Sequence, residues 1–357
     1  MVGSGEIAEA VPSSATFPAE WAPHRRCWIA WPCRHDAWSG GMDAARAATA
    51  EVIGAIAPFE PVVLVHHPED ASSIPRSFSN QVSTVAIPID DSWLRDSGPT
   101  FRRTDDNRVE AIAWQFNAWG EIYTPYDQDR EVARHIAARA GTPIIRVDLV
   151  LEGGAIHTDG RGTILVTAEC LLHPSRNPGL TQPMIERRIL TALGADRMIW
   201  LPAGLMDDET AGHVDEIATF IDERTILLAG GGGRSDPNRA RVDACRRALN
   251  QTRTADGQAW RIAEAPTPMP RFHDNGVRIT QSYVNCYLAG QGERAAVIIP
   301  AFNDPADADA AAMFRELVPD REIVQVDATA ITRGGGGIHC ITQQEPLPLD
   351  ASPAGTA

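Results

Sequence analysis

The chain has 357 residues with 32 basic and 47 acidic side chains, which gives a formal net charge of −15 at neutral pH. It contains no lysine, so Schiff-base catalysis and a phosphate-binding P-loop, which both need a lysine amine, are excluded. The acidic balance disfavours nucleic acid and membrane surfaces as partners, because both are polyanions. No apolar run approaches the roughly 20 residues of a membrane-spanning helix, and the N-terminus lacks the pattern of a signal peptide.

Short apolar runs rich in β-branched and aromatic residues predict strands along most of the chain. They occupy residues 25–31, 61–66, 82–89, 109–114, 144–147, 162–166, 197–201, 217–221, 225–228, 278–283, 295–299 and 323–326. Helical spacing of apolar residues predicts helices at 43–57, 129–140, 183–193, 236–250 and 305–317. Asp129 and Asp236 stand where N-terminal caps are expected.

The alternation of two or three strands with one helix recurs roughly five times, which favours an α/β protein of repeated small units. No linker divides the sequence, so residues 17–346 are expected to form one catalytic domain. The ends, 1–16 and 347–357, are small, polar and proline-containing, and are expected to be flexible. The six cysteines are dispersed without a C-x-x-C pair, which predicts free thiols and a cytoplasmic protein.

The strongest local pattern is the glycine-rich run GGGGIHCITQQ at 334–344. Its glycines permit unusual backbone angles or the close approach of a ligand, and Cys340 follows in a short apolar segment. This arrangement suits a nucleophilic thiol at the end of a strand. The alternative, which composition alone favours, is a flexible loop beside a buried structural cysteine.

A second pattern, at 212–216, pairs a histidine with a carboxylate. In an extended segment His213 and Asp215 point to the same side, which suits a general acid/base histidine with an orienting or substrate-binding aspartate. The same pair can supply two ligands to a metal ion, but a third ligand at a recognisable spacing is missing. A surface loop with ordinary charges is the remaining alternative.

Two further segments place carboxylates directly after apolar runs. Residues 90–99 contain Asp90, Trp93 and Asp96 before the end of a Gly-Pro turn, and Glu152 stands before a glycine pair. Loops at strand ends are frequent positions for binding sites. A solvated loop and an ordinary strand-to-turn junction are the alternatives.

Taken together, the sequence resembles the agmatine deiminase family of the guanidine-modifying (pentein) superfamily. The resemblance rests on segments at 17–32, 90–101, 116–129, 151–178, 198–216, 282–289 and 334–346, in the order and spacing of the family. It extends over nearly the whole chain. The joint occurrence of LEGG, GHVD and GGGGIHC is specific, whereas each motif alone is weak.

The resemblance implies a five-bladed α/β propeller of ββαβ-type units around a pseudo-fivefold axis, with the site in a central channel. It implies hydrolysis of agmatine to N-carbamoylputrescine and ammonia through a cysteine-bound thiouronium, with neither a metal nor an organic cofactor. Carried over by motif, Cys340 is the nucleophile and His213 the acid/base, while Asp96, Glu152 and Asp215 contact the guanidinium or orient the histidine. A homodimer or higher homo-oligomer and a role in polyamine metabolism are also implied.

These residue types suit a small cationic guanidinium substrate, which is a poor electrophile. Carboxylates can grip its N–H edges bidentately and fix its central carbon. A thiolate then adds to that carbon, and a cationic substrate or a protonated histidine beside Cys340 favours the thiolate. His213 can protonate the departing ammonia and later activate water. Trp93 can lie along the four-carbon chain of agmatine, or simply form a wall of the channel.

Three positions depart from the family pattern, namely Ala211, Glu216 and Gly337. Glu216 and Gly337, together with Trp93 and Asp90, are predicted to bind substrate. One hypothesis is that Glu216 adds negative charge to the pocket and favours a substrate whose cation is differently placed. The alternatives are a deiminase for another alkylguanidine or an arginine-like substrate, an amidinotransferase, and a non-catalytic pentein that binds or scaffolds.

Overall fold

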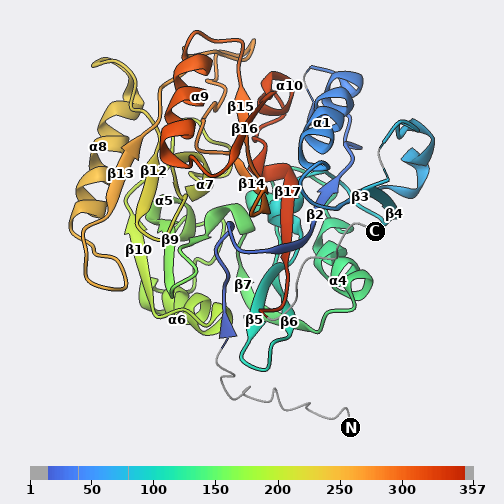
Figure 1. The fold of residues 1–357 in the computed structure, drawn as a ribbon, viewed down its shortest axis with the longest axis horizontal. Coiled ribbons are helices and arrows are strands. Elements are labelled where there is room, and N and C mark those ends of the chain that lie inside the picture. Colours follow the sequence, from blue (N-terminus) through green and yellow to red (C-terminus); the bar gives the residue numbers. More distant parts are fainter. Residues whose placement is uncertain (1–14, 39, 79, 350–357) are drawn as a thin grey trace.

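The computed structural model describes residues 15–38, 40–78 and 80–349. Within these ranges the strands form five sheets of three or four strands each. Figure 1 shows them in a view down the shortest axis of the molecule. The first sheet contains β1 (Ala15–Thr16), β5 (Thr100–Thr104), β6 (Val109–Gln115) and β7 (Ile144–Val150), and the second contains β8 (His157–Thr158), β9 (Thr163–Thr167) and β10 (Arg197–Leu201). The third contains β11 (Ala218–Phe220), β12 (Thr225–Leu228) and β13 (Arg261–Glu264), and the fourth contains β14 (Tyr287–Gln291), β15 (Arg294–Ala301) and β16 (Glu322–Asp327). The last contains β17 (Thr342–Pro346), β2 (His24–Ala30), β3 (Val62–His66) and β4 (Val82–Ala86).

The five sheets share one connection pattern. An antiparallel pair is followed by a parallel pair, and a helix makes the crossover between the two parallel strands. Parallel neighbours need such a crossover, whereas antiparallel neighbours can be joined by a tight turn. The crossover helices are α1 (Met42–Ile56), α4 (Asp129–Ala140), α6 (Gln182–Leu193), α8 (Pro237–Asn250) and α9 (Ala306–Leu317).

The last of these sheets joins the two ends of the described chain. The C-terminal strand β17 runs antiparallel to β2, with Thr342 opposite Ile29, and the two strands lie side by side in Figure 1. Cys340 stands two residues before β17, in the short helical turn η3 (His339–Ile341). The position of Cys340 is therefore fixed by pairing with a strand from the start of the chain.

The predicted helices are confirmed to within about a residue or two at each end. Asp236 does cap α8, because its carboxylate accepts a hydrogen bond from Asn238 N. The cap predicted at Asp129 is wrong. Asp129 is the first helical residue of α4, and its carboxylate instead accepts hydrogen bonds from the backbone N–H groups of Asp90 and Asp91.

Most predicted strands are present, but residues 278–283 form no strand beyond an isolated bridge between Arg278 and Phe272. Their apolar side chains, such as Tyr283, are buried in the core without a ladder. Five strands that pattern alone did not indicate are β5, β8, β13, β14 and β17. The two-residue strand β1 also lies within a segment predicted to be flexible, whereas 1–14 and 350–357 are outside the described residues.

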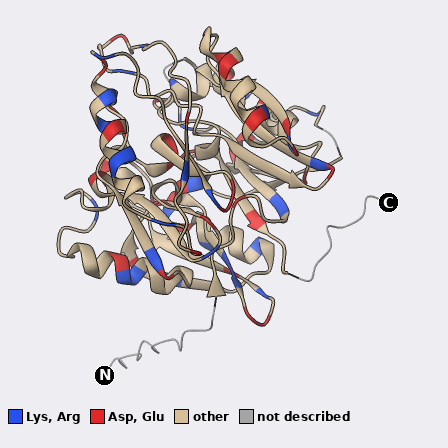
Figure 2. Cartoon of the chain, turned by 60° about the vertical axis from the view of Figure 1, so that its left-hand side comes forward, with Lys and Arg blue, Asp and Glu red and all other residues tan. Residues whose placement is uncertain are grey.

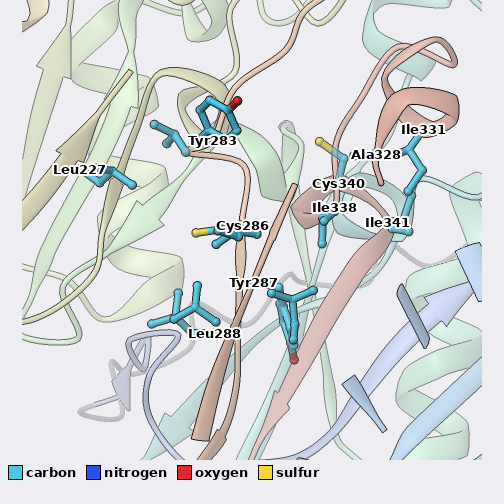
Figure 3. Close-up of a cluster of buried hydrophobic side chains, with 14 of the residues drawn as sticks. Leu227, Tyr283, Cys286, Tyr287, Leu288, Ala328, Ile331, Ile338, Cys340 and Ile341 are labelled. Carbon is cyan, nitrogen blue, oxygen red and sulfur yellow. The ribbon is translucent and has the colours of Figure 1, made fainter. Parts of the chain in front are cut away.

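A large apolar cluster includes Ile338, Cys340 and Ile341, which belong to the segment that leads into β17. Figure 3 shows the sulfur of Cys340 at the border of this cluster, directed away from the side chain of Ile338. The six cysteines are all free, as the sequence predicted. Acidic and basic residues are interspersed along the elements (Figure 2). None of the helices in the described ranges combines the length and apolar composition needed to cross a membrane.

Candidate active site

Four short helical turns bring together the five residues that the sequence predicted to be catalytic. Asp96 lies in α2 (Leu94–Ser97), Glu152 directly precedes η2 (Gly153–Ala155), His213 and Asp215 lie at the start of α7 (Val214–Ile217), and Cys340 lies in η3. Each side chain is at most 6% exposed. Five ionisable groups from distant parts of the chain therefore converge in one buried place.

The distances within this cluster are short. Cys340 Sγ lies 3.7 Å from Asp215 Oδ2. His213 stands between two carboxylates, with Nδ1 3.8 Å from Asp96 Oδ2 and Nε2 3.7 Å from Glu152 Oε2. The arrangement places a thiol, an imidazole and three carboxyl groups around one point.

Gly154 makes this convergence possible. A Cβ added to Gly154 would lie 2.6 Å from His213 Nδ1, 2.9 Å from Asp96 Oδ1 and 3.1 Å from Asp215 Oδ2. The backbone N–H of Gly154 donates a 2.9 Å hydrogen bond to Asp96 Oδ1. A side chain at this position would occupy the space between His213, Asp96 and Asp215, so the second glycine of the LEGG motif is required for steric reasons.

The surroundings of Cys340 favour its neutral thiol over the thiolate. Burial raises its pKa well above the usual range, and the neighbouring carboxyl groups of Asp215, Glu216 and Asp96 raise it further. Asn285 Nδ2 lies 3.2 Å from the sulfur. A cation bound among these carboxylates would reverse the electrostatic part of the shift and favour the thiolate.

His213 has the opposite bias. Burial favours its neutral form, but the carboxylates of Asp96 and Glu152 and the thiol of Cys170 outweigh it, so its pKa is raised well above the usual value. Neither ring nitrogen has a hydrogen-bond partner among the described residues. The surroundings of His213 therefore favour its imidazolium form.

The carboxyl groups differ in their protonation. Burial raises the pKa of Asp96 to about 6, with Asp215 and Glu152 adding to the rise and His213 opposing it. The pKa of Glu152 is lowered despite its burial, because Arg176 and His213 favour the anion. Arg176 Nε lies 2.7 Å from Glu152 Oε1. This ion pair occupies one oxygen of Glu152 and leaves Oε2 facing His213.

A cavity of about 20 Å³ opens beside Cys340 and Asp96. Trp93 and Trp119 form walls, and Trp93 is itself stacked on Trp38 with ring centroids 5.1 Å apart. The other lining residues are Tyr123, Glu209, Thr210 and the glycines 334–336. Such a cavity holds about one water molecule, so an alkylguanidinium can enter only if some of the lining moves.

The sequence predicted that Asp90 binds substrate, but its carboxylate is engaged by the backbone. Its Oδ2 accepts hydrogen bonds from the backbone N–H groups of Gln128 and Asp129, at 2.8 and 3.4 Å. In turn, the carboxylate of Asp129 accepts hydrogen bonds from the backbone N–H groups of residues 90 and 91. The carboxylate of Asp90 therefore fastens the start of α4 to the loop that precedes α2.

Gly337 and Glu216, which the sequence predicted to bind substrate, lie beside Asn285 and Cys340, respectively. A Cβ on Gly337 would lie 2.2 Å from Asn285 Oδ1, so this glycine faces Asn285 and does not line the cavity. Glu216 Oε1 lies 3.7 Å from Cys340 Sγ. Burial, Asp215 and Asp208 raise the pKa of Glu216 well above its usual value, which favours its neutral form. The hypothesis that Glu216 adds negative charge to the pocket stays a prediction.

Several residues of the site were not singled out from the sequence. They are Gly154, Trp119, Arg176 and Asn285, and each lies within a segment that carries the family resemblance. Their positions in those segments were the available signal. Without distances, however, the residues that touch the catalytic groups cannot be separated from their neighbours.

Two groups in the described residues bring three potential metal ligands within 4.8 Å of one another. One comprises Glu152, Cys170 and His213, and the other Glu20, His157 and His339. Asp215 belongs to neither group. The metal site that paired His213 with Asp215 therefore gains no third ligand from the described part of the chain.

A model of the Porphyromonas-type peptidyl-arginine deiminase family matches residues 16–346. Among curated proteins, the chain is 40% identical over 358 residues to the agmatine deiminase of Pseudomonas aeruginosa strain UCBPP-PA14, covering 94% of this chain and 96% of the relative. It is 39% identical over 356 residues to the agmatine deiminase of Stutzerimonas stutzeri, covering 93% and 96%. The solved structure of the Enterococcus faecalis agmatine deiminase matches with a TM-score of 0.90 and 30% identity, covering 96% of this chain and 100% of that one.

Proposed function

The chain belongs to the Porphyromonas-type peptidyl-arginine deiminase family, and from this premise we propose that it hydrolyses agmatine to N-carbamoylputrescine and ammonia. The single observation that carries the proposal is the placement of Cys340 Sγ 3.7 Å from Asp215 within a buried group of carboxylates that also holds His213. Carboxylates in a buried site select a cation, and a thiol beside them supplies the nucleophile. The enzyme is a hydrolase that acts on guanidino C–N bonds.

The guanidinium binds between Asp96, Glu152 and Asp215, whose oxygens accept hydrogen bonds from its planar N–H edges. Glu152 contributes Oε2, because its other oxygen is paired with Arg176. Binding places the central carbon near Cys340 and partly neutralises the carboxylates that hold the thiol protonated. The Cys340 proton is then lost to solvent, which leaves a thiolate beside a cationic carbon.

In the first half-reaction, the thiolate adds to the guanidinium carbon and forms the C–S bond. The imidazolium of His213 donates its proton to one nitrogen, the C–N bond breaks, and ammonia leaves a cationic S-alkylthiouronium on Cys340. In the second half-reaction, the now neutral His213 takes a proton from water, and the resulting hydroxide adds to the thiouronium carbon. The C–S bond breaks, thiolate is released, and loss of a proton to solvent gives the substituted urea.

The outer end of the cavity suits the second cation of agmatine. Glu209 is exposed there and accepts a 2.8 Å hydrogen bond from the hydroxyl of Tyr123. A carboxylate at this place attracts an ammonium group and repels the α-carboxylate of arginine. Trp93 supplies an apolar wall between the inner carboxylates and Glu209, along which the four-carbon chain can lie.

We further infer that the five sheets are the blades of a pseudo-fivefold propeller and that residues 17–346 form one catalytic domain. The shared connection pattern and the closure of the last sheet by β17 and β2 support this arrangement. A homodimer, a cytoplasmic location and a role in polyamine metabolism are suggested by the family resemblance. The molecular mass in solution, measured by light scattering, tests the dimer.

The decisive experiment compares ammonia release from agmatine by the wild-type enzyme and by Cys340→Ser, without an amine acceptor. We expect turnover in the wild type and none in the variant, with Cys245→Ser as the matched control because Cys245 is a buried thiol in α8 outside the site. Turnover by Cys340→Ser would refute the mechanism. A requirement for an amine acceptor would identify an amidinotransferase, and absence of turnover in the wild type would favour a non-catalytic protein.

A further inference from the structure

His339 connects a catalytic carboxylate to a second carboxylate outside the cavity. Its Nδ1 lies 2.8 Å from Asp215 Oδ2, and its Nε2 lies 2.8 Å from Glu20 Oε2. All three side chains are at most 3% exposed. His339 also directly precedes Cys340 in the chain, so the bridge ends beside the nucleophile.

The geometry determines the charge of the bridge. A neutral imidazole carries one N–H, whereas hydrogen bonds to two ionised carboxylates require an N–H on each ring nitrogen. His339 therefore satisfies both contacts as an imidazolium. In agreement, the pKa of His339 is raised in spite of its burial and that of Asp215 is lowered in spite of its burial, since His339 favours the ionised forms of Glu20 and Asp215 and both carboxylates favour the imidazolium of His339.

Hydrogen bonds hold the carboxylate of Glu20 and the backbone of His339 in place. Glu20 Oε1 accepts a 2.8 Å hydrogen bond from Leu288 N in β14. The backbone N–H of His339 donates a 2.8 Å hydrogen bond to Asn285 Oδ1, and Asn285 Nδ2 contacts Cys340 Sγ at 3.2 Å. The carbonyl of His339 accepts a hydrogen bond from Arg95 Nε. The imidazole consequently has little freedom to leave Asp215.

We propose that His339 is a positioning residue that acts as a permanent imidazolium between Glu20 and Asp215 and holds Asp215 ionised and aimed at the guanidinium. This role rests on the proposed deiminase function, because it concerns how Asp215 receives the substrate. Without the bridge, Asp215 would be a buried carboxylate beside Glu216 and Asp96, and it would bind a proton more readily. A protonated Asp215 accepts fewer hydrogen bonds from a guanidinium and offers it no charge.

His157 is a neighbour of the bridge but not part of it. Its Nδ1 accepts a 3.3 Å hydrogen bond from Phe220 N, so its single proton is on Nε2, which lies 2.7 Å from Thr219 Oγ1 and 3.7 Å from Glu20 Oε2. Burial keeps the pKa of His157 low and the ring neutral. The titratable and charged groups that face Asp215 and His339 are Glu20, Arg95, Asp96, His157, His213, Glu216 and Cys340.

The test compares His339→Gln with the matched control His157→Gln, which changes the other histidine beside Glu20. We expect His339→Gln to lower kcat/KM for agmatine roughly tenfold or more at neutral pH, chiefly by raising KM, because Asp215 loses its charge partner. The acid limb of the pH profile, which Asp96 sets in the wild type, should move upward by about half a pH unit or more, because Asp215 without its cation becomes the last carboxyl group to ionise. His157→Gln should leave the limb in place, and an unmoved limb in His339→Gln would overturn the proposal.

A second measurement keeps the bridge testable whether or not agmatine is the substrate. Nitrogen NMR of the histidine rings in Cys340→Ser, with the His339 signal identified by its loss in the double variant with His339→Gln, reports the protonation of each ring nitrogen. We expect both nitrogens of His339 to remain protonated at about pH 8, above the usual histidine pKa. A neutral ring at that pH would refute the bridge, whereas a protonated ring in a protein without agmatine turnover would refute only the substrate.

Discussion

The indole Nε1 of Trp119 donates a 2.9 Å hydrogen bond to Oδ2 of Asp96. Trp119 adopts a left-handed backbone conformation, with φ of 56°, in a loop that also has positive φ at Ala118 and Glu121. Arg176 secures this strained loop, because its Nη1 donates a 2.6 Å hydrogen bond to the carbonyl of Trp119. Trp119, which orients Asp96, therefore lies in a loop that Arg176 holds in place. Arg176 is also the ion-pair partner of Glu152.

Replacing Trp119 with phenylalanine removes the donor to Asp96 while keeping an aromatic wall. Hydrogen bonds to charged groups are worth about 1.5–3 kcal/mol, so we expect kcat/KM for agmatine to fall roughly 10- to 100-fold. Trp114→Phe is the matched control, since it loses a 2.9 Å indole hydrogen bond to Thr100 outside the site. Equal losses in both variants would show that the Trp119 effect is structural.

Gly154→Ala introduces a methyl group between His213, Asp96 and Asp215. Because displacement of a catalytic group by about 1 Å can cost a hundredfold, we expect kcat/KM to fall by roughly that factor or more. The control is Gly54→Ala in α1, where an added Cβ meets no atom within 4 Å. That change should stabilise the protein by about 0.5–1 kcal/mol and leave turnover unaltered. Full activity in Gly154→Ala would contradict the proposed geometry.

Arg176→Gln leaves the buried carboxylate of Glu152 without its cation. Loss of one partner of a buried pair costs about 3–5 kcal/mol, so we expect the free energy of unfolding in urea to fall by about that amount. Arg134→Gln, which breaks the exposed pair with Glu131, should change it by about 0.5 kcal/mol or less. The double variant Arg176→Gln, Glu152→Gln should recover part of the loss, and no recovery would show that the contacts of Arg176 with the backbone dominate.

Asp96 should set the acid limb of the reaction. It binds a guanidinium as an anion and its pKa is raised to about 6, so kcat/KM should fall as the pH drops below about 6. Stability has the opposite dependence. Between about pH 4 and 6 the folded protein keeps a proton on Asp96 that the unfolded chain has lost, so this residue favours unfolding increasingly as pH rises through that window.

Asp96→Asn removes that proton linkage. We therefore expect the variant to gain stability relative to the wild type as pH rises from about 4 to 6, measured by urea unfolding at several pH values. A constant difference across the window would mean that Asp96 does not titrate there.

Glu209→Gln tests the outer end of the cavity. We expect KM for agmatine to rise roughly tenfold, while the KM of butylguanidine, which lacks the second cation, should stay the same. The control is Glu121→Gln, because the carboxylate of Glu121 also accepts a tyrosine hydrogen bond, from Tyr126, but does not line the cavity. Equal changes in KM for both compounds would contradict recognition of the ammonium by Glu209.

The strands and helices with a clear apolar pattern could be predicted from the sequence, and β17 shows why others could not. Its residues Gln343, Gln344 and Glu345 are polar yet buried, so its hydrophobic pattern is that of a loop. Hydrogen bonds compensate the burial of two of these polar side chains. Arg95 donates a 2.7 Å hydrogen bond to Gln344, and Trp28 donates a 2.9 Å hydrogen bond to Glu345. These partners are known only once the fold is known.

The site was predicted in part for the same reason. Cys340 and His213 stand in motifs whose joint occurrence identifies the family, and the structure brings them together with Asp96, Glu152 and Asp215. Asp90 and Gly337 stand in segments of the same resemblance, but Asp90 accepts hydrogen bonds from backbone N–H groups and Gly337 lies against Asn285. The distinction depends on the direction of each side chain, which a spacing along the chain does not specify.

The pairing of β17 with β2 has a consequence for biosynthesis. Because β2 is made before β17, one edge of β2 stays unpaired while the strands β3 to β16 are made. The loop that carries Cys340 has no fixed place until that pairing forms. In a nascent chain, the carboxylates and His213 of the candidate site are therefore made well before Cys340 reaches its fixed position.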